Sequence, residues 1–185
     1  MLRTRRSLHE ALNTLILEKG YEATTVGDIV ARANVGRSTF YGHHGGKEDL
    51  LLSGLEHLQK TLLAWQREAL AAADGSSERT LGFSRAFFEH VHEYRHLLQP
   101  LHRSEAGPAV TRRLKRVLTS VVRNELRPDR QAGPIPREAA ARFAADALLS
   151  VLSWWFEQCP RLKPAEVNTI FRRLALPGFV AAGIS

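Results

Sequence analysis

The chain lacks most of what extracellular and membrane proteins depend on. Its 185 residues include a single cysteine, Cys159, which excludes an internal disulfide framework and is typical of a reducing cytoplasm. No run approaches the roughly 18 uninterrupted apolar residues that a membrane span needs. The charged N-terminus, MLRTRRSLHE, is not followed by the apolar stretch of a secretory signal. We therefore expect a cytoplasmic location and no membrane partner.

The sequence also lacks the short motifs of the common enzyme classes. It has no G-x-S-x-G, no H-E-x-x-H and no phosphate-binding glycine loop. Cys159 lies near a predicted helix end and has no evident base beside it in the sequence. We therefore expect a protein that is not an enzyme and that carries no cofactor.

Four histidines in the middle of the chain invite comparison with a metal site: His90, His92, His96 and His102. His92 and His96 are four residues apart and share one face of a helix, which is the minimum geometry for two imidazole ligands. No cysteine is near them, and the other spacings are irregular. We interpret them as solvent-facing or pocket histidines and expect no metal.

What the sequence does contain is helical periodicity. Leu8, Leu12, Leu15 and Ile16 form the stripe of an amphipathic helix, and Gly20 is placed to end it. No segment alternates apolar and polar residues as a strand would. The pattern predicts an all-α fold of about nine helices, with an N-terminal three-helix module followed by a C-terminal helical bundle. After the module, the expected helices cover residues 47–73, 78–95, 96–102, 108–127, 137–158 and 164–176.

Two short helices and a tight turn follow the first amphipathic helix. Thr25 can cap the first of them, with Asp28 at the reciprocal capping-box position. Asn34-Val35-Gly36 reads as the turn, because Asn and Gly tolerate left-handed backbone angles. The second short helix runs from Arg37 to about Tyr41, where a glycine-rich stretch begins. This arrangement predicts a helix-turn-helix unit whose second helix enters the major groove of DNA.

Net charge alone would not have located this unit. The chain carries a formal charge of +7, but residues 1–50 hold seven Lys and Arg against six Asp and Glu. Much of the excess lies in residues 112–127, where six basic residues face only Glu125. We expect that run to be a solvated face, with attraction of an anionic effector as the alternative.

The run EKGYEATTVGDIVARANVGRSTFYGHHGGKEDLL closely resembles the signature of the TetR family of bacterial transcriptional regulators. The resemblance covers about residues 5–55 without gaps. It implies a homodimer whose N-terminal modules bind the two half-sites of a palindromic operator in double-stranded DNA. It also implies two domains, with residues 1–46 binding DNA and residues 47–185 providing effector binding and dimerisation.

The resemblance assigns the expected DNA contacts position by position: Thr25, Arg37, Ser38, Thr39, Tyr41, His43 and Lys47. Arg37 is the expected base reader, since a bidentate pair with guanine is worth about 1–3 kcal/mol of discrimination. Thr25 is expected at phosphate, and Ser38 and Thr39 at phosphate or bases. Tyr41, His43 and Lys47 resemble the residues with which the family clamps the DNA backbone. Arg3, Arg5 and Arg6 are either a basic arm that reaches DNA or a solvated tail.

Three positions depart from the family's pattern. Gly27 and Gly42 stand where many members carry long side chains that touch DNA, so base reading is expected to depend on Arg37 and the basic arm. His44 replaces the aromatic residue, commonly Phe, that closes the module against its connecting helix. A half-buried imidazole there must find a hydrogen-bond partner or weaken the junction.

The C-terminal half is rich in aromatic residues, most of which belong in a core. Trp154 and Trp155 point about 100° apart on their helix, so they cannot both serve one packing surface. We expect a ligand pocket lined by Trp65, Phe87, Tyr94 and Trp155. The helix at 137–158 is apolar over much of its circumference and needs covering on two sides. The resemblance implies that the last two helices pair with their copies across a dimer interface.

Taken together, these features predict a homodimeric DNA-binding repressor that leaves its palindromic operator when a small-molecule effector binds the C-terminal domain. The alternative is a DNA-binding regulator that is controlled by a protein partner or by abundance. A preformed pocket of several hundred Å³ would favour the first, and a solid core the second.

Overall fold

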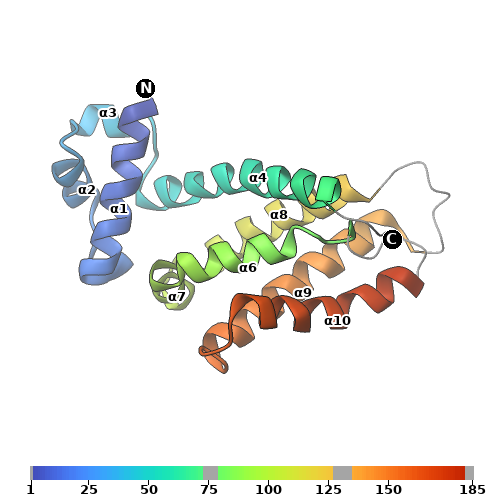
Figure 1. The fold of residues 1–185 in the computed structure, drawn as a ribbon. Coiled ribbons are helices and arrows are strands. Elements are labelled where there is room, and N and C mark those ends of the chain that lie inside the picture. The colour runs from blue at the N-terminus through green and yellow to red at the C-terminus, as the bar shows by residue number, and fades with distance from the viewer. Residues whose placement is uncertain (1, 73–78, 127–134, 182–185) are drawn as a thin grey trace. The chain divides into compact units, whose positions relative to one another are not determined.

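A computed structural model describes residues 2–72, 79–126 and 135–181 of the chain. Over these residues it contains nine helices and no strand, which confirms the predicted all-α fold (Figure 1). None of the helices in these three ranges is long and apolar enough to cross a bilayer.

The helices divide between two compact units. The first, here called the N-terminal unit, comprises residues 1–57 and 94–113; the second, here called the bundle unit, comprises residues 58–93 and 114–185. Helices α4 (Lys47–Ala72) and α8 (Gly107–Glu125) contribute residues to both units. The predicted boundary between a DNA-binding and an effector domain at residue 46 concerns function, and it stays a prediction.

The N-terminal unit is built on α1 (Leu2–Ala23), α2 (Val26–Ala33), α3 (Arg37–Tyr41) and α7 (Arg95–Arg103). Its core confirms the predicted stripe, because all four members are buried. The same cluster includes residues from each neighbouring helix, among them Ile29 of α2, Phe40 of α3, Leu50 of α4 and Leu101 of α7. Helix α7, which lies far along the chain, therefore completes the core around the helix-turn-helix.

The two short helices begin as predicted. Thr25 is the N-cap of α2, and its hydroxyl and the Asp28 carboxylate form the full capping box. Asn34 takes the left-handed conformation after α2, with φ 52° and ψ 49°. Gly36 has φ −69° and serves instead as the N-cap of α3, so only Asn34 supplies the left-handed angle of the turn.

Gly20, at which the sequence predicted the end of the first helix, lies at a break within α1. Gly20 has φ 82° and ψ 164°, far from helical values, and one further turn continues to Ala23. An L-residue rarely adopts such a positive φ, whereas glycine does so at little cost. The chain thus bends at Gly20 before it enters α2.

The bundle unit contains the rest of α4 and α8 together with α6 (Ser84–Glu93), α9 (Arg137–Glu157) and α10 (Pro164–Ala181). Helix α10 packs against both α6 and α9. Phe88 lies at the centre of its aromatic core, with ring centroids 6.1 Å from Trp155 and 6.0 Å from Phe171. These edge-to-face contacts add specificity to the burial of large rings.

Two predicted helix bounds are wrong. The helix expected at 78–95 begins only at Ser84, because Leu81 holds a positive φ of 56° that interrupts helical geometry. The last helix continues past 176 to Ala181 despite Pro177. Phe179 is buried in this extension, so burial of its ring offsets the hydrogen bond that Pro177 cannot donate.

Candidate nucleic-acid interface

The first turn of α3 places three predicted DNA contacts on the surface. Arg37, Ser38 and Thr39 are exposed, whereas Phe40 is fully buried and fixes the helix to the core. The Phe40 N–H donates to the Gly36 carbonyl at 3.0 Å and closes the turn. A five-residue helix held by one buried ring presents its remaining faces outward, as a recognition helix must.

The guanidinium group of Arg37 is available to bind a DNA base. In the part of the chain that the structure describes, its guanidinium makes no hydrogen bond or ion pair. It does lie beside the start of α2, since a Cβ built on Gly27 would be 3.5 Å from Arg37 Nη2. The absence of a side chain at Gly27 therefore leaves room for the arginine.

Tyr41 and His43 follow α3 at its C-terminal end. The Tyr41 side chain is 58% exposed and packs edge-on against the Phe40 ring, with centroids 5.3 Å apart. His43 is half-buried beside His44. A hydroxyl on a ring that is already held by packing can contact phosphate with little further loss of conformational entropy.

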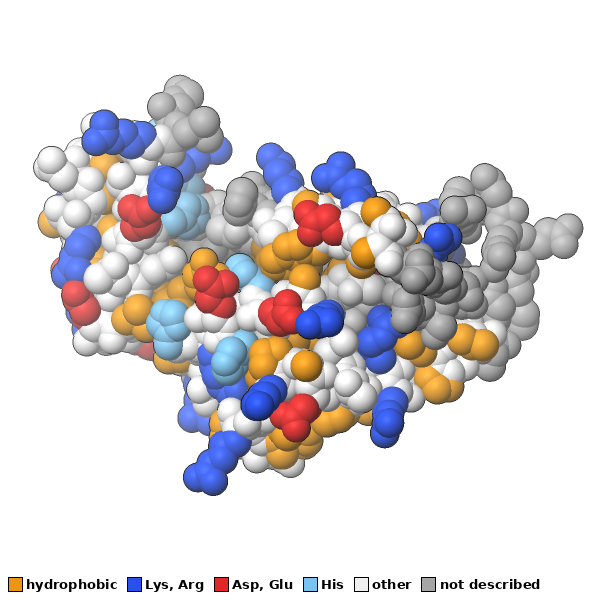
Figure 2. All heavy atoms as spheres, viewed as in Figure 1, with side chains coloured by type: hydrophobic (Ala, Val, Ile, Leu, Met, Phe, Trp, Pro, Cys, Tyr) orange, Lys and Arg blue, Asp and Glu red, His pale blue; other side chains and the backbone are white. Residues whose placement is uncertain are grey.

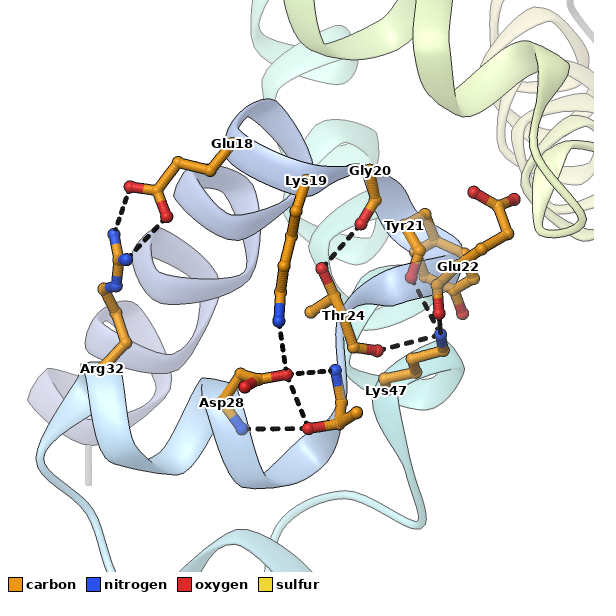
Figure 3. Close-up of polar contacts among 10 residues, drawn as sticks. Glu18, Lys19, Gly20, Tyr21, Glu22, Thr24, Asp28, Arg32 and Lys47 are labelled. Atoms are coloured by element: carbon orange, nitrogen blue, oxygen red, sulfur yellow. Dashed lines mark hydrogen bonds and ion pairs between the residues drawn. The ribbon is translucent and has the colours of Figure 1, made fainter.

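Thr25 is exposed, but its hydroxyl is engaged in the start of α2. The Thr25 Oγ1 donates to Asp28 Oδ2 at 2.6 Å and accepts from the Asp28 N–H at 3.2 Å. Lys19 Nζ also donates to Asp28 Oδ2, at 2.8 Å (Figure 3). The hydrogen bonds from Lys19 and Thr25 hold the pKa of Asp28 well below its usual range. Thr25 thus serves first as a helix cap.

Ion pairs fix α2 against α1. Arg32 donates two hydrogen bonds to the Glu18 carboxylate, at 2.7 and 2.6 Å (Figure 3). Both side chains are largely exposed, so the pair contributes through its bidentate geometry more than through its charge. Together with the pair between Lys19 and Asp28, it joins the two helices at both ends of α2.

His44 is buried, with only 5% of its surface exposed. Its Nδ1 lies 3.5 Å from Asp49 Oδ2, and its ring packs near Phe40 and His9 at centroid distances of 5.8 and 6.2 Å. Nε2 has no hydrogen-bond partner among the described residues. Burial lowers the pKa of His44, against the opposing effect of Asp49. The imidazole therefore fills the place of the usual aromatic residue as a neutral ring.

The basic residues expected at DNA lie at two places in this unit. Arg3, Arg5 and Arg6 belong to the first turns of α1, where Arg6 pairs with Glu10 at 2.8 Å. The ammonium of Lys47, which we expected at phosphate, faces the backbone at the end of α1 (Figure 3). No feature of the sequence signalled that contact.

The four residues expected to line a pocket differ in burial. Phe87 and Trp155 are buried in the bundle unit, and Trp155 Nε1 donates to the Leu162 carbonyl at 3.1 Å. Trp65 is half-buried beside His90, at 5.4 Å between ring centroids. Tyr94 belongs to the N-terminal unit. The pocket therefore stays a prediction. In the described ranges no three His, Cys, Asp or Glu side chains are placed to hold a metal ion.

Surface charge does not single out an interface. On the face drawn in Figure 2, Lys and Arg side chains are spread over the surface and mixed with Asp and Glu. The local geometry of α1, α2 and α3 is the more specific signal. A supporting helix, a left-handed turn residue and an exposed short second helix together define a helix-turn-helix DNA-binding unit.

Comparison with known proteins agrees with this class. Residues 8–53 match the family described as bacterial regulatory proteins, tetR family. A segment of 52 residues, 28% of the chain, is 40% identical to the uncharacterized HTH-type transcriptional regulator YxbF of Bacillus subtilis (strain 168). That segment spans 14% of the length of this relative.

Solved structures extend the similarity beyond the N-terminal residues. Thermus thermophilus FadR, a TetR-family transcriptional repressor in complex with lauroyl-CoA, is 26% identical with a TM-score of 0.69, over 94% of each chain. A putative TetR-family regulator from Syntrophomonas wolfei str. Goettingen has a TM-score of 0.70 and 20% identity, over 96% of this chain and 95% of that one, and shows the same fold. Residues 8–53 therefore resemble the DNA-binding segment of the TetR family, and the described chain has the fold of TetR-family regulators.

Proposed function

We propose that the protein is a homodimeric repressor that binds a palindromic operator and is released by a small-molecule effector. The observation that carries the proposal is the exposed first turn of α3, in which Arg37 has no intramolecular partner in the described chain while Phe40 fixes the helix from below. A helix held in this way can insert its N-terminal residues into the major groove.

The proposed contacts follow from exposure and chemistry. Arg37 pairs with guanine, and Ser38 and Thr39 contact the neighbouring bases or phosphates. Tyr41 and His43 contact the backbone at the other end of α3. Thr25 adds a contact at the start of α2, where its hydroxyl must exchange its bond to Asp28 for one to phosphate. In a dimer these groups would read two half-sites about 34–36 Å apart, one helical turn of DNA.

Exposed apolar residues on the last two helices support the dimer. Phe143 of α9 is 55% exposed, and Leu174 and Val180 of α10 are 70% and 55% exposed. Trp154 is only half-buried, although Trp155 next to it is fully enclosed. A second copy that covers α9 and α10 would remove this apolar surface from water.

The effector is proposed to bind in the bundle unit. Thermus thermophilus FadR is 26% identical over 94% of each chain and holds lauroyl-CoA, which supports a small-molecule ligand for this chain as well. Within the N-terminal unit, Glu22 Oε1 accepts a hydrogen bond from the Glu105 N–H at 2.9 Å and so ties the end of α1 to the segment before α8. Because α4 and α8 contribute to both units, they are the continuous routes by which ligand binding would reach α1.

The proposal is tested with purified protein and the DNA upstream of its own gene. Fluorescence anisotropy would measure operator affinity with and without candidate small molecules. Replacing Arg37 with Ala should lower discrimination between operator and scrambled DNA by about 1–3 kcal/mol for each half-site, because the guanine pair is lost. Arg85, an exposed arginine of the bundle unit, provides the matched control through Arg85→Ala. Equal operator affinity of the Arg37 variant and the wild type would reject the assigned site.

A further inference from the structure

Lys47 is the first residue of α4, and its ammonium group is directed at the end of α1 (Figure 3). Nζ donates to the backbone carbonyl oxygens of Tyr21, Glu22 and Thr24 at 2.8, 3.2 and 3.0 Å. An ammonium has three N–H donors and no acceptor, so these three oxygens occupy all of them. The same charge lies 4.3 Å from the centroid of the Tyr21 ring, within the range of cation–π attraction.

The carbonyl oxygens that Lys47 binds follow the break in α1. The positive φ of Gly20 ends the regular ladder of helical hydrogen bonds, and the last turn leaves its carbonyl groups to find other donors. Thr24 helps by donating its hydroxyl to the Gly20 carbonyl at 2.7 Å. A cation at this point also opposes the partial negative charge at a helix C-terminus. Lys47 therefore supplies hydrogen-bond donors and a positive charge to the C-terminal end of α1.

The contact also lies next to the start of α2. Thr24, whose carbonyl Lys47 holds, immediately precedes Thr25, the N-cap of α2. The first turn of α2 is in turn close to the base reader, since a Cβ on Gly27 would lie 3.5 Å from the Arg37 guanidinium. A short path thus connects Lys47 with Arg37 through the beginning of α2.

We propose that Lys47 is a positioning residue, which holds α2 and thereby Arg37 in the DNA-binding arrangement and does not contact phosphate. The proposal rests on the proposed function, because it concerns how the operator-binding surface is held. Thr24, whose carbonyl Lys47 binds, is buried, so a move of the ammonium to DNA would take a donor from a carbonyl of a buried residue. The Tyr21 carbonyl would keep only its hydrogen bond from the Thr24 N–H.

The salt dependence of DNA binding separates the two roles. Each lysine that neutralises a phosphate contributes about 0.9 to the slope of log K against log salt concentration. Lys47→Met keeps an apolar stem of similar length over Tyr21 but removes all three donors. Lys60→Met, at an exposed lysine of the same helix, is the matched control. Operator affinity would be measured for the wild type and both variants from 50 to 300 mM KCl, a range chosen around roughly physiological ionic strength.

We expect Lys47→Met to bind the operator at least about tenfold more weakly, since a hydrogen bond to a charged group is worth at least that factor. The slope of log K against log salt concentration should not change. Lys60→Met should match the wild type in both. A slope that falls by about 0.9 for each protomer would identify a phosphate contact and overturn the proposal. Unchanged operator affinity in Lys47→Met would overturn it as well.

A second measurement needs no DNA. Amide hydrogen exchange in the free protein should be faster at Asp28 and Ile29, in the first turn of α2, in Lys47→Met than in the wild type, because the start of the helix is no longer fixed. Exchange in Lys60→Met should not change there. Equal exchange in all three proteins would contradict the positioning role of Lys47, whether or not the wild type binds operator. Failure of the wild type to bind operator would instead reject the proposed function.

Discussion

The imidazole rings of His44 and His9 lie close together in the N-terminal unit, with centroids 6.2 Å apart. His9 Nε2 lies 3.1 Å from Ser53 Oγ, and burial is the largest cause that lowers the pKa of His9. Burial likewise lowers the pKa of His44 below its ordinary 6.5. Arg5 acts on both histidines in the same direction, and Asp49 opposes the shift at His44. Both rings are therefore held neutral in the folded protein.

This predicts that the protein loses stability in mild acid. As the pH falls below about 6.5, the histidines of the unfolded chain bind protons before those of the folded chain, so unfolding becomes more favourable. The loss continues until the pH passes the lowered pKa values of the folded state. Thermal unfolding followed by circular dichroism between pH 8 and pH 5 would record the decrease.

His44→Phe should make the unfolding temperature less dependent on pH than in the wild type, because it removes one of the three imidazoles, His9, His44 and His90, whose pKa burial lowers. His96→Phe, at an exposed position of α7, is the control and should retain the wild-type dependence. Identical pH profiles for His44→Phe and the wild type would show that His44 is not responsible.

The contrast between Thr25 and Lys47 shows which side-chain roles a sequence reveals. The capping box of Thr25 and Asp28 was predictable because its partners lie three residues apart and belong to one local geometry. The partners of Lys47 lie 23 to 26 residues away and are backbone carbonyl groups, which every sequence position offers. Only the bend at Gly20 brings them to the ammonium.

At the scale of the element, the break in α1 depends on a single glycine. Gly20→Ala should destabilise the protein by about 1–2 kcal/mol, because an L-residue at φ 82° is strained. The strain comes from the backbone alone, since a Cβ at Gly20 would meet only Glu22 Oε2, at 3.9 Å. Chemical denaturation of the purified variant would measure the change.

Gly45→Ala is the matched control for that substitution. Gly45 has no atom within 4 Å of a built Cβ and no positive φ. We expect its free energy of unfolding to stay within about 0.5 kcal/mol of the wild type, as is usual at unconstrained surface positions. A Gly20 variant as stable as the Gly45 variant would mean that α1 can straighten at this point.

The helices that were predicted best are those with strong local signals at both ends. The bounds of α2 and α3 follow from Thr25, Asn34 and the glycines around them. The start of α6 does not, because Leu81 reaches its positive φ through tertiary contacts: it is fully buried and its N–H bonds to the Glu125 carboxylate, 44 residues away. Long-range packing of this kind has no signature in a window of sequence.

At the scale of the whole molecule, the proposed dimer gives a further prediction. Leu174→Glu should convert the protein to a monomer at micromolar concentration, since a charge would be buried at the proposed contact between copies. Size-exclusion chromatography with light scattering would report the mass, and operator affinity should fall because one protomer reads only one half-site.

Leu17→Glu is the corresponding control. Leu17 lies on α1 and is 49% exposed, so the substitution adds the same charge to an apolar surface position outside α9 and α10. This variant should keep the mass of the wild type. If Leu174→Glu also kept that mass, a dimer through α10 would be excluded.

The N-terminal unit is discontinuous along the chain, and this affects how hybrid regulators can be made. Leu97, Leu101 and Ala106 belong to the same buried cluster as Leu8 and Leu12 of α1. A hybrid that joins residues 1–46 to a foreign effector domain would leave that cluster without its own covering helix. Transferring operator specificity from this protein therefore requires residues 94–113 to be transferred together with the N-terminal helices. The boundary for recombination follows the buried cluster that these segments share, and no single position in the sequence defines it.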